Sequence, residues 1–81
     1  MKVRCEPEGV LEMLREEGIL ELPSDCGVEV DLFEAGLDSM AVMQLIVVIE
    51  ERFGVALGVG DASREALGTP TSMAVTINTK G

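Results

Sequence analysis

Apolar side chains recur at helical spacing in the first part of the chain. Val10, Leu11 and Leu14 are separated by glutamates, as in a helix that buries one face and exposes the other. Gly18 follows this stretch and provides a C-terminal stop. The pattern predicts a helix over residues 7–17.

A second apolar stripe follows a short polar pair. Asp38 and Ser39 can each cap a helix, because either side chain can accept a hydrogen bond from the first unpaired backbone N–H groups. Beyond them, apolar residues follow at steps of three and four and end before Gly54. This pattern predicts the main helix, and its buried positions are expected to be Val42, Leu45, Ile46, Ile49 and Phe53.

The remaining segments predict a long connection and two shorter helical pieces. Residues 18–37 show no clear period and contain proline and glycine, which indicates a long loop held partly to the core. Residues 61–67 predict one or two helical turns, and residues 71–78 predict a last helix with Met73 and Ile77 inward. No segment alternates like a strand for long, although residues 27–33 come closest. We expect an all-α fold, a small four-helix bundle with three main helices, one short helix and a long first loop, in a single domain over residues 1–81.

Charge narrows the classes of partner. The chain of 81 residues holds 15 acidic and 6 basic residues, a net charge of −9. Binding to phosphate backbones requires basic surface, so we expect no nucleic acid partner and favour basic proteins instead. The longest apolar run, residues 40–49, is interrupted by Gln44 and is about half as long as a membrane helix requires, so no membrane span is expected.

The two cysteines, Cys5 and Cys26, lack the spacing of a metal site. Histidine is absent from the chain as well, so we expect no bound metal. A disulfide between the two stays open, but two reduced thiols are the favoured interpretation. The first residues contain no apolar stretch typical of a signal peptide, and we expect a cytoplasmic protein.

Ser39 is the residue whose role this pattern leaves open. A serine nucleophile needs an adjacent base, and the chain has no histidine, no G-x-S-x-G elbow, and lysines only at its ends. We therefore expect no enzyme. A calcium loop over residues 31–42 fails as well, because its third, fifth and twelfth places hold Phe33, Ala35 and Val42 instead of oxygen ligands. A helix cap is the simplest remaining role.

The main helix carries more apolar residues than one buried stripe requires. Met40, Val47 and Val48 form a second set that shares a side with Gln44 and Glu51. Exposed apolar surface beside a capped serine predicts a partner-binding face, and methionine adapts to partners of varied shape. The alternative is that the loop or the last helix covers these residues.

Residues 31–57 resemble the phosphopantetheine-binding segment of carrier proteins, a family of acyl, peptidyl and D-alanyl carriers. That segment reads D/E-L-F-x-x-G-L-D-S before a hydrophobic helix that ends in phenylalanine with a short apolar tail. The matching positions are Asp31, Leu32, Phe33, Gly36, Leu37, Asp38, Ser39, Met40, Leu45, Ile49, Phe53 and Leu57. Residues 62–73 are similar to a stretch of D-alanyl carrier proteins at Arg64, Thr69 and Pro70, although Leu67 stands where that branch has tryptophan.

The resemblance implies a role for both polar residues at the helix start. A phosphopantetheinyl transferase would attach 4′-phosphopantetheine to Ser39, and Asp38 would be recognised by that transferase. The arm would carry an acyl group, as in fatty acid or lipid biosynthesis, or an aminoacyl group, as a thioester. A ligase would load this cargo onto a monomeric, acyl-carrier-like domain that passes it to downstream transferases. The alternative is a non-enzymatic, acidic helical interaction module in which Ser39 is only a helix cap.

Overall fold

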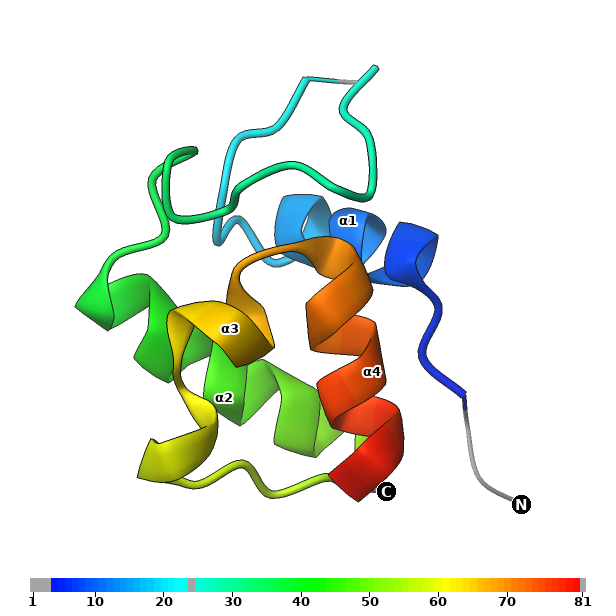
Figure 1. Ribbon diagram of the computed structural model, residues 1–81, viewed down its shortest axis with the longest axis vertical. Helices are drawn as coiled ribbons and strands as arrows, with labels where there is room; N and C mark the ends of the chain where they lie inside the picture. Colours follow the sequence, from blue (N-terminus) through cyan, green and yellow to red (C-terminus); the bar gives the residue numbers. More distant parts are fainter. Residues whose placement is uncertain (1–3, 24, 81) are drawn as a thin grey trace.

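The computed structural model describes residues 4–23 and 25–80, and within them every regular element is a helix (Figure 1). The elements in chain order are α1 (Pro7–Glu16), α2 (Ser39–Phe53), the 3-10 turn η1 (Val59–Asp61), α3 (Arg64–Leu67) and α4 (Pro70–Lys80). The prediction of an all-α fold with three main helices and one short helix is confirmed. Over these same residues, no helix combines the length and the apolar content that crossing a membrane requires.

Local stops end α1 and α2, and a side-chain cap begins α3. Gly18 after α1 and Gly54 after α2 have φ angles of 67° and 68°, a left-handed conformation that glycine adopts without strain. The first helix ends at Glu16, one residue before the predicted end, and α2 ends at Phe53, before Gly54 as predicted. The predicted segment 61–67 is divided, because Ser63 caps α3 by accepting a hydrogen bond from the Ala66 N–H at 3.1 Å.

The last helix begins earlier than predicted because of a reciprocal cap. Thr69 Oγ1 accepts a hydrogen bond from the Ser72 N–H at 3.0 Å, and Ser72 Oγ accepts one from the Thr69 N–H at 3.1 Å. Two N–H groups that a helix start leaves unpaired are thereby satisfied. The helix therefore begins at Pro70, before the predicted range 71–78, and it continues beyond that range.

The core is built from aliphatic and methionine side chains of all four helices and of the long loop. α4 packs against both α1 and α3. Fully buried side chains are Val10, Met13, Leu14, Leu32, Leu45, Ile49, Leu67, Pro70, Met73 and Ile77. Four of the residues expected to face inward are among them, namely Leu45, Ile49, Met73 and Ile77. The other three, Val42, Ile46 and Phe53, are only partly buried and lie at the edge of the buried stripe.

The long loop between α1 and α2 is held to the rest of the bundle. It arches over one end of the molecule before it reaches α2 (Figure 1). The Leu32 N–H donates to the Gly68 carbonyl at 2.7 Å, and the Thr71 N–H donates to the Val28 carbonyl at 3.1 Å. Isolated hydrogen bonds therefore tie the segment 27–33 to Gly68 and to Thr71 at the start of α4, and the segment forms no strand.

The N-terminal segment is fastened to the last helix. The Cys5 N–H donates to Asn78 Oδ1, and Asn78 Nδ2 donates to the Cys5 carbonyl, each at 2.9 Å. The Cys5 side chain is 2% exposed, and this burial, with a smaller effect of the Glu6 carboxylate, raises the pKa of its thiol to about 11. Cys26 lies half-buried in the loop, and both thiols are free.

At neutral pH a thiol reagent should label Cys26 well before Cys5, because only the thiolate reacts and Cys5 is buried and hard to deprotonate. Asn78→Ala removes both hydrogen bonds that hold Cys5, so it should speed the labelling of Cys5 selectively. Mass spectra taken over time would give both rates. Thr79→Ala, at the exposed neighbouring position, is the matched control. An Asn78→Ala protein with an equally slow Cys5 would show that these bonds do not protect the thiol.

Candidate functional site

A compact turn precedes the main helix and sets its direction. Asp31 Oδ1 accepts hydrogen bonds from the N–H groups of Phe33 at 3.0 Å and Glu34 at 3.2 Å. Gly36 follows with a φ of 118°, a backbone conformation that side chains other than that of glycine rarely adopt. Leu37 is buried, so the chain enters α2 from a fixed point in the core while Phe33 stays partly at the surface.

Asp38, and not Ser39, caps α2. The Asp38 backbone is extended, and its Oδ1 accepts a hydrogen bond from the Ala41 N–H at 2.9 Å. Ser39 is the first residue of the helix and is exposed. Among the described residues its hydroxyl makes no hydrogen bond, and the first N–H groups of a helix have no partner within the helix. The sequence left open which of the two residues forms the cap, and the structure assigns the cap to Asp38.

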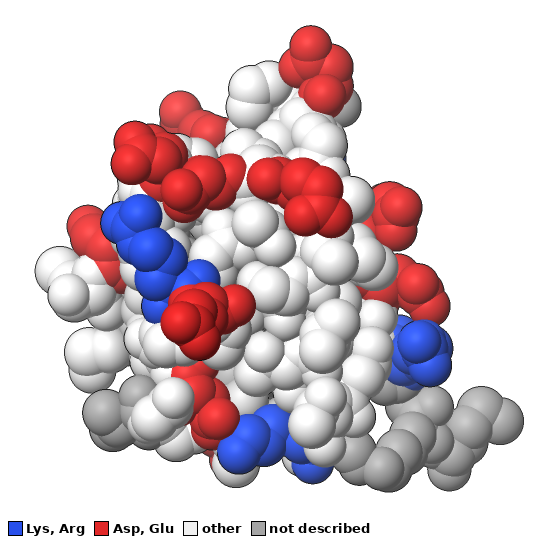
Figure 2. Space-filling view, viewed as in Figure 1, with Lys and Arg blue, Asp and Glu red and all other residues white. Residues whose placement is uncertain are grey.

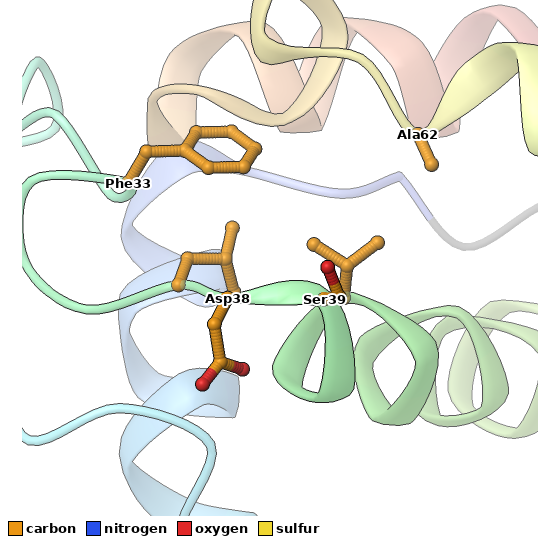
Figure 3. A pocket seen from close by; sticks show the side chains of 6 residues that line it. Phe33, Asp38, Ser39 and Ala62 are labelled. Carbon is orange, nitrogen blue, oxygen red and sulfur yellow. The ribbon is translucent and has the colours of Figure 1, made fainter.

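A hollow of about 430 Å³ opens beside this serine. Its lining residues are Phe33, Leu37, Asp38, Ser39, Val42 and Ala62. Figure 3 shows the Phe33 ring and Ala62 above the start of α2, with the Ser39 hydroxyl on the same side as both. The Asp38 carboxylate points to the opposite side (Figure 3). The serine hydroxyl therefore faces an apolar surface, and the one carboxylate among the lining residues is turned away from it.

The electrostatic surroundings of the site are negative. No lysine or arginine occurs between Arg15 and Arg52, so the whole loop and most of α2 lack basic residues. Acidic side chains gather at the loop end of the molecule in Figure 2. Arg64 contributes positive charge nearby, since its guanidinium lies 5.1 Å from the centroid of the Phe33 ring and 3.9 Å from Asp31 Oδ2.

Most residues of the predicted partner-binding face are at the surface. Met40 is 81% exposed and Val47 is 55% exposed, and both Gln44 and Glu51 are exposed as well. Val48 is only 7% exposed and belongs to the core, so its assignment to this face is wrong. The physical reason is helical rotation, because Val48 lies three residues after the buried Leu45 and turns toward the same side.

Met43 is the surface residue that the sequence analysis missed. Its side chain is 69% exposed, and it lies between Met40 and Val47 in steps of three and four residues. These three residues form one apolar strip along α2, which we call the methionine strip. The helical spacing of Met40, Met43 and Val47 is visible in the sequence, so Met43 could have been predicted from it.

Comparison with known families identifies the family of this chain. A family described as "Phosphopantetheine attachment site" matches residues 9–76, a range that contains every residue lining the hollow. The chain belongs to this family. It is therefore a carrier protein whose cofactor is covalently attached 4′-phosphopantetheine, and the alternative of an interaction module is set aside.

Curated relatives of this carrier protein carry the name D-alanyl carrier protein. The one from Enterococcus faecalis is 49% identical over 43 residues, which are 52% of this chain and 55% of the relative. The chain thus aligns with about half the length of that relative. The one from Bacillus velezensis is 32% identical over 63 residues, which are 76% of this chain and 74% of the relative.

Solved structures with the same fold contain carrier proteins bound to a ligase. One is a crystal structure of an engineered Bradyrhizobium japonicum glycine:carrier-protein ligase complexed with a carrier protein from Agrobacterium tumefaciens and ATP. The matched chain has a TM-score of 0.74 and 28% identity, over 90% of this carrier protein and 96% of that chain. The corresponding complex with AMP gives a TM-score of 0.73 and 28% identity, over 90% of this carrier protein and 99% of that chain.

The residues at the start of α2 fit the cofactor of a carrier protein. The Ser39 hydroxyl is exposed and has no hydrogen-bond partner among the described residues, so a group attached to it displaces no contact. The unpaired N–H groups and the dipole of a helix N-terminus favour a phosphate. The Asp38 carboxylate, which would repel that phosphate, points to the other side of the chain (Figure 3).

Asp38→Ala should lower the free energy of unfolding by about 1 kcal/mol, the usual cost of a lost helix cap. Ser39→Ala should change it by less than about 0.5 kcal/mol, because the serine side chain caps nothing. Urea unfolding of both variants, with Asp38→Asn as a control that keeps the cap, would measure these changes. If Ser39→Ala costs as much as Asp38→Ala, the serine hydroxyl contributes to the cap after all.

Proposed function

We propose that Ser39 is the attachment point of 4′-phosphopantetheine and that this carrier protein holds aminoacyl groups on the arm as thioesters. The observation that carries the proposal is the division of roles at the start of α2. Asp38 caps the helix, and the adjacent Ser39 hydroxyl is exposed, without a hydrogen bond among the described residues, at the first helical position. A hydroxyl that makes no structural contact at a helix N-terminus is well placed to be esterified to a phosphate.

Attachment requires chemistry that the carrier protein does not supply. Ser39 Oγ attacks a phosphorus atom of coenzyme A, so an Oγ–P bond forms, a P–O bond of the diphosphate breaks and adenosine bisphosphate leaves. A phosphopantetheinyl transferase provides the base that takes the hydroxyl proton and the magnesium that binds the diphosphate, because the chain contains no histidine. Asp38 is exposed, and its carboxylate, which points away from the Ser39 hydroxyl, is the group that this transferase would recognise.

The carrier protein positions its cofactor and performs no reaction on the cargo. The cofactor supplies a terminal thiol on a long flexible arm, which raises the local concentration of the cargo at successive partner enzymes. The N–H groups of Ser39 and Met40, in the first turn of α2, would hold the phosphate at the root of the arm.

An amino acid is the cargo that the comparisons support. The curated relatives are D-alanyl carrier proteins, and the carrier protein of similar fold is in complex with a glycine:carrier-protein ligase. The loading partner is accordingly an amino acid ligase that uses ATP, and downstream transferases receive the aminoacyl group. The negative charge around α2 favours partners with basic surface.

Three further properties stay predictions. A monomer is expected because copies with a net charge of −9 repel one another. A cytoplasmic location is expected because coenzyme A and ATP are available there. A single domain over residues 1–81 is expected from the length of the chain.

Incubation with coenzyme A, magnesium and a broad-specificity phosphopantetheinyl transferase should add one phosphopantetheine to the intact mass. Ser39→Ala should gain no mass while its circular dichroism and melting temperature stay close to those of the parent protein. The Asp38→Asn protein should keep the helix cap. It should be loaded more slowly, because it lacks the negative charge that the transferase would recognise. Absence of loading in the parent protein, with the transferase active on another carrier protein, would refute the proposal.

Val47→Glu should weaken aminoacylation of the loaded protein by an amino acid ligase, mainly through a higher KM. The substitution places a charge in the methionine strip, where a partner would have to desolvate it. Val75→Glu is the matched control, because Val75 is 59% exposed and lies on α4. Both variants should remain folded, and an equal effect of both on KM would show that the methionine strip is not the ligase contact.

A further inference from the structure

The hollow beside Ser39 is apolar surface that the proposed function leaves without a role. Phe33, Leu37, Val42 and Ala62 contribute carbon atoms to its lining, from the loop, from α2 and from the segment before α3. Phe33 and Val42 are only partly buried, so the hollow is open to solvent. Apolar surface exposed in this way favours cover by an apolar group. The cargo lies at the far end of the arm, so it is not the nearest candidate.

The chemistry of the arm identifies a group that fits. A few covalent bonds beyond the phosphate, the pantoyl unit carries a quaternary carbon with two methyl groups. This is the most compact apolar group of the arm, and the amide-containing segments that follow it prefer water. The Ser39 hydroxyl already faces the hollow in Figure 3, so the first apolar unit attached there is next to an apolar surface.

We infer that the hollow is a seat for the dimethyl-bearing pantoyl unit at the root of the arm. The inference rests on the proposed attachment at Ser39. Phe33, Val42 and Ala62, which line the hollow, would contact the two methyl groups. The seat directs the root of the arm toward Phe33 and Ala62 and away from the Asp38 carboxylate, while the distal part of the arm stays mobile.

Arg64 is a positioning residue for this seat. Its guanidinium lies over the Phe33 ring at 5.1 Å, and its contact with Asp31 at 3.9 Å is the longest ion pair among the described residues. Asp31 also shapes the turn that carries Phe33, through its bond to the Phe33 N–H. Arg64 thereby contacts the ring, and Asp31 fixes the backbone that carries it.

Nuclear magnetic resonance of the loaded protein tests the inference directly. Protein labelled with ¹³C and ¹⁵N carries an unlabelled arm, and filtered nuclear Overhauser spectra record contacts between the two. We expect contacts from the pantoyl methyl protons to Phe33 and Val42, and an upfield shift of these protons relative to free coenzyme A from the Phe33 ring. Methyl shifts equal to those of coenzyme A, with no such contacts, would overturn the inference.

Matched variants separate the seat from general effects on the fold. Val42→Thr places a hydroxyl in the hollow and should reduce the methyl contacts, whereas Val47→Thr, the same change on the exposed side of α2, should leave them intact. Arg64→Gln should reduce the upfield shift while Ser39 is loaded normally, because the ring is less well held. An equal loss of contacts in both threonine variants would refute the seat.

Intact mass, measured before each spectrum, separates this inference from the proposed function. A protein that gains no phosphopantetheine contradicts attachment at Ser39. A fully loaded protein without arm contacts in the hollow contradicts only the seat. Contacts made by an acylated thiol in place of the pantoyl methyl groups would also refute it, because the hollow would then hold cargo.

Discussion

The hydrogen bond from the Ala41 N–H to Asp38 Oδ1 determines what Ser39 can do. A helix start needs one side chain to accept a hydrogen bond from its unpaired N–H groups, and two adjacent residues could do so here. Because Asp38 is the cap, the helix begins at Ser39 and the serine hydroxyl is not needed to stabilise it. The cap thus makes an ordinary serine available for modification without loss of stability.

The long acidic loop contains both the cap residue Asp38 and Phe33, which lines one side of the hollow. Its stability does not come from regular structure but from a few anchors, namely the buried Leu32 and Leu37 and the bond from the Leu32 N–H to the Gly68 carbonyl at 2.7 Å. The turn between these two leucines places Phe33 beside α2. Loop, α2 and the segment before α3 must therefore all be folded for the hollow to exist.

α2 serves three purposes with two sides of one helix. Leu45 and Ile49 face the core, and the methionine strip faces outward. Val42 lies on the same side as the core pair, one turn nearer the start of the helix, and lines the hollow next to Ser39. On the proposed function, an arm attached at the start of the helix and a partner enzyme on the methionine strip would leave the packing beneath them undisturbed.

The sequence by itself determined the all-α class, the helices α1 and α2 and the carrier motif that contains Ser39, because periodicity, caps and turn residues act over short distances along the chain. Met43 could have been found from the same spacing. Only the tertiary structure decided that Asp38 forms the cap, since this depends on the path of the loop into α2. It also decided that Val48 is core, because the rotation of α2 is set by what packs beneath it, and that Phe33 and Ala62, distant in sequence, line one hollow.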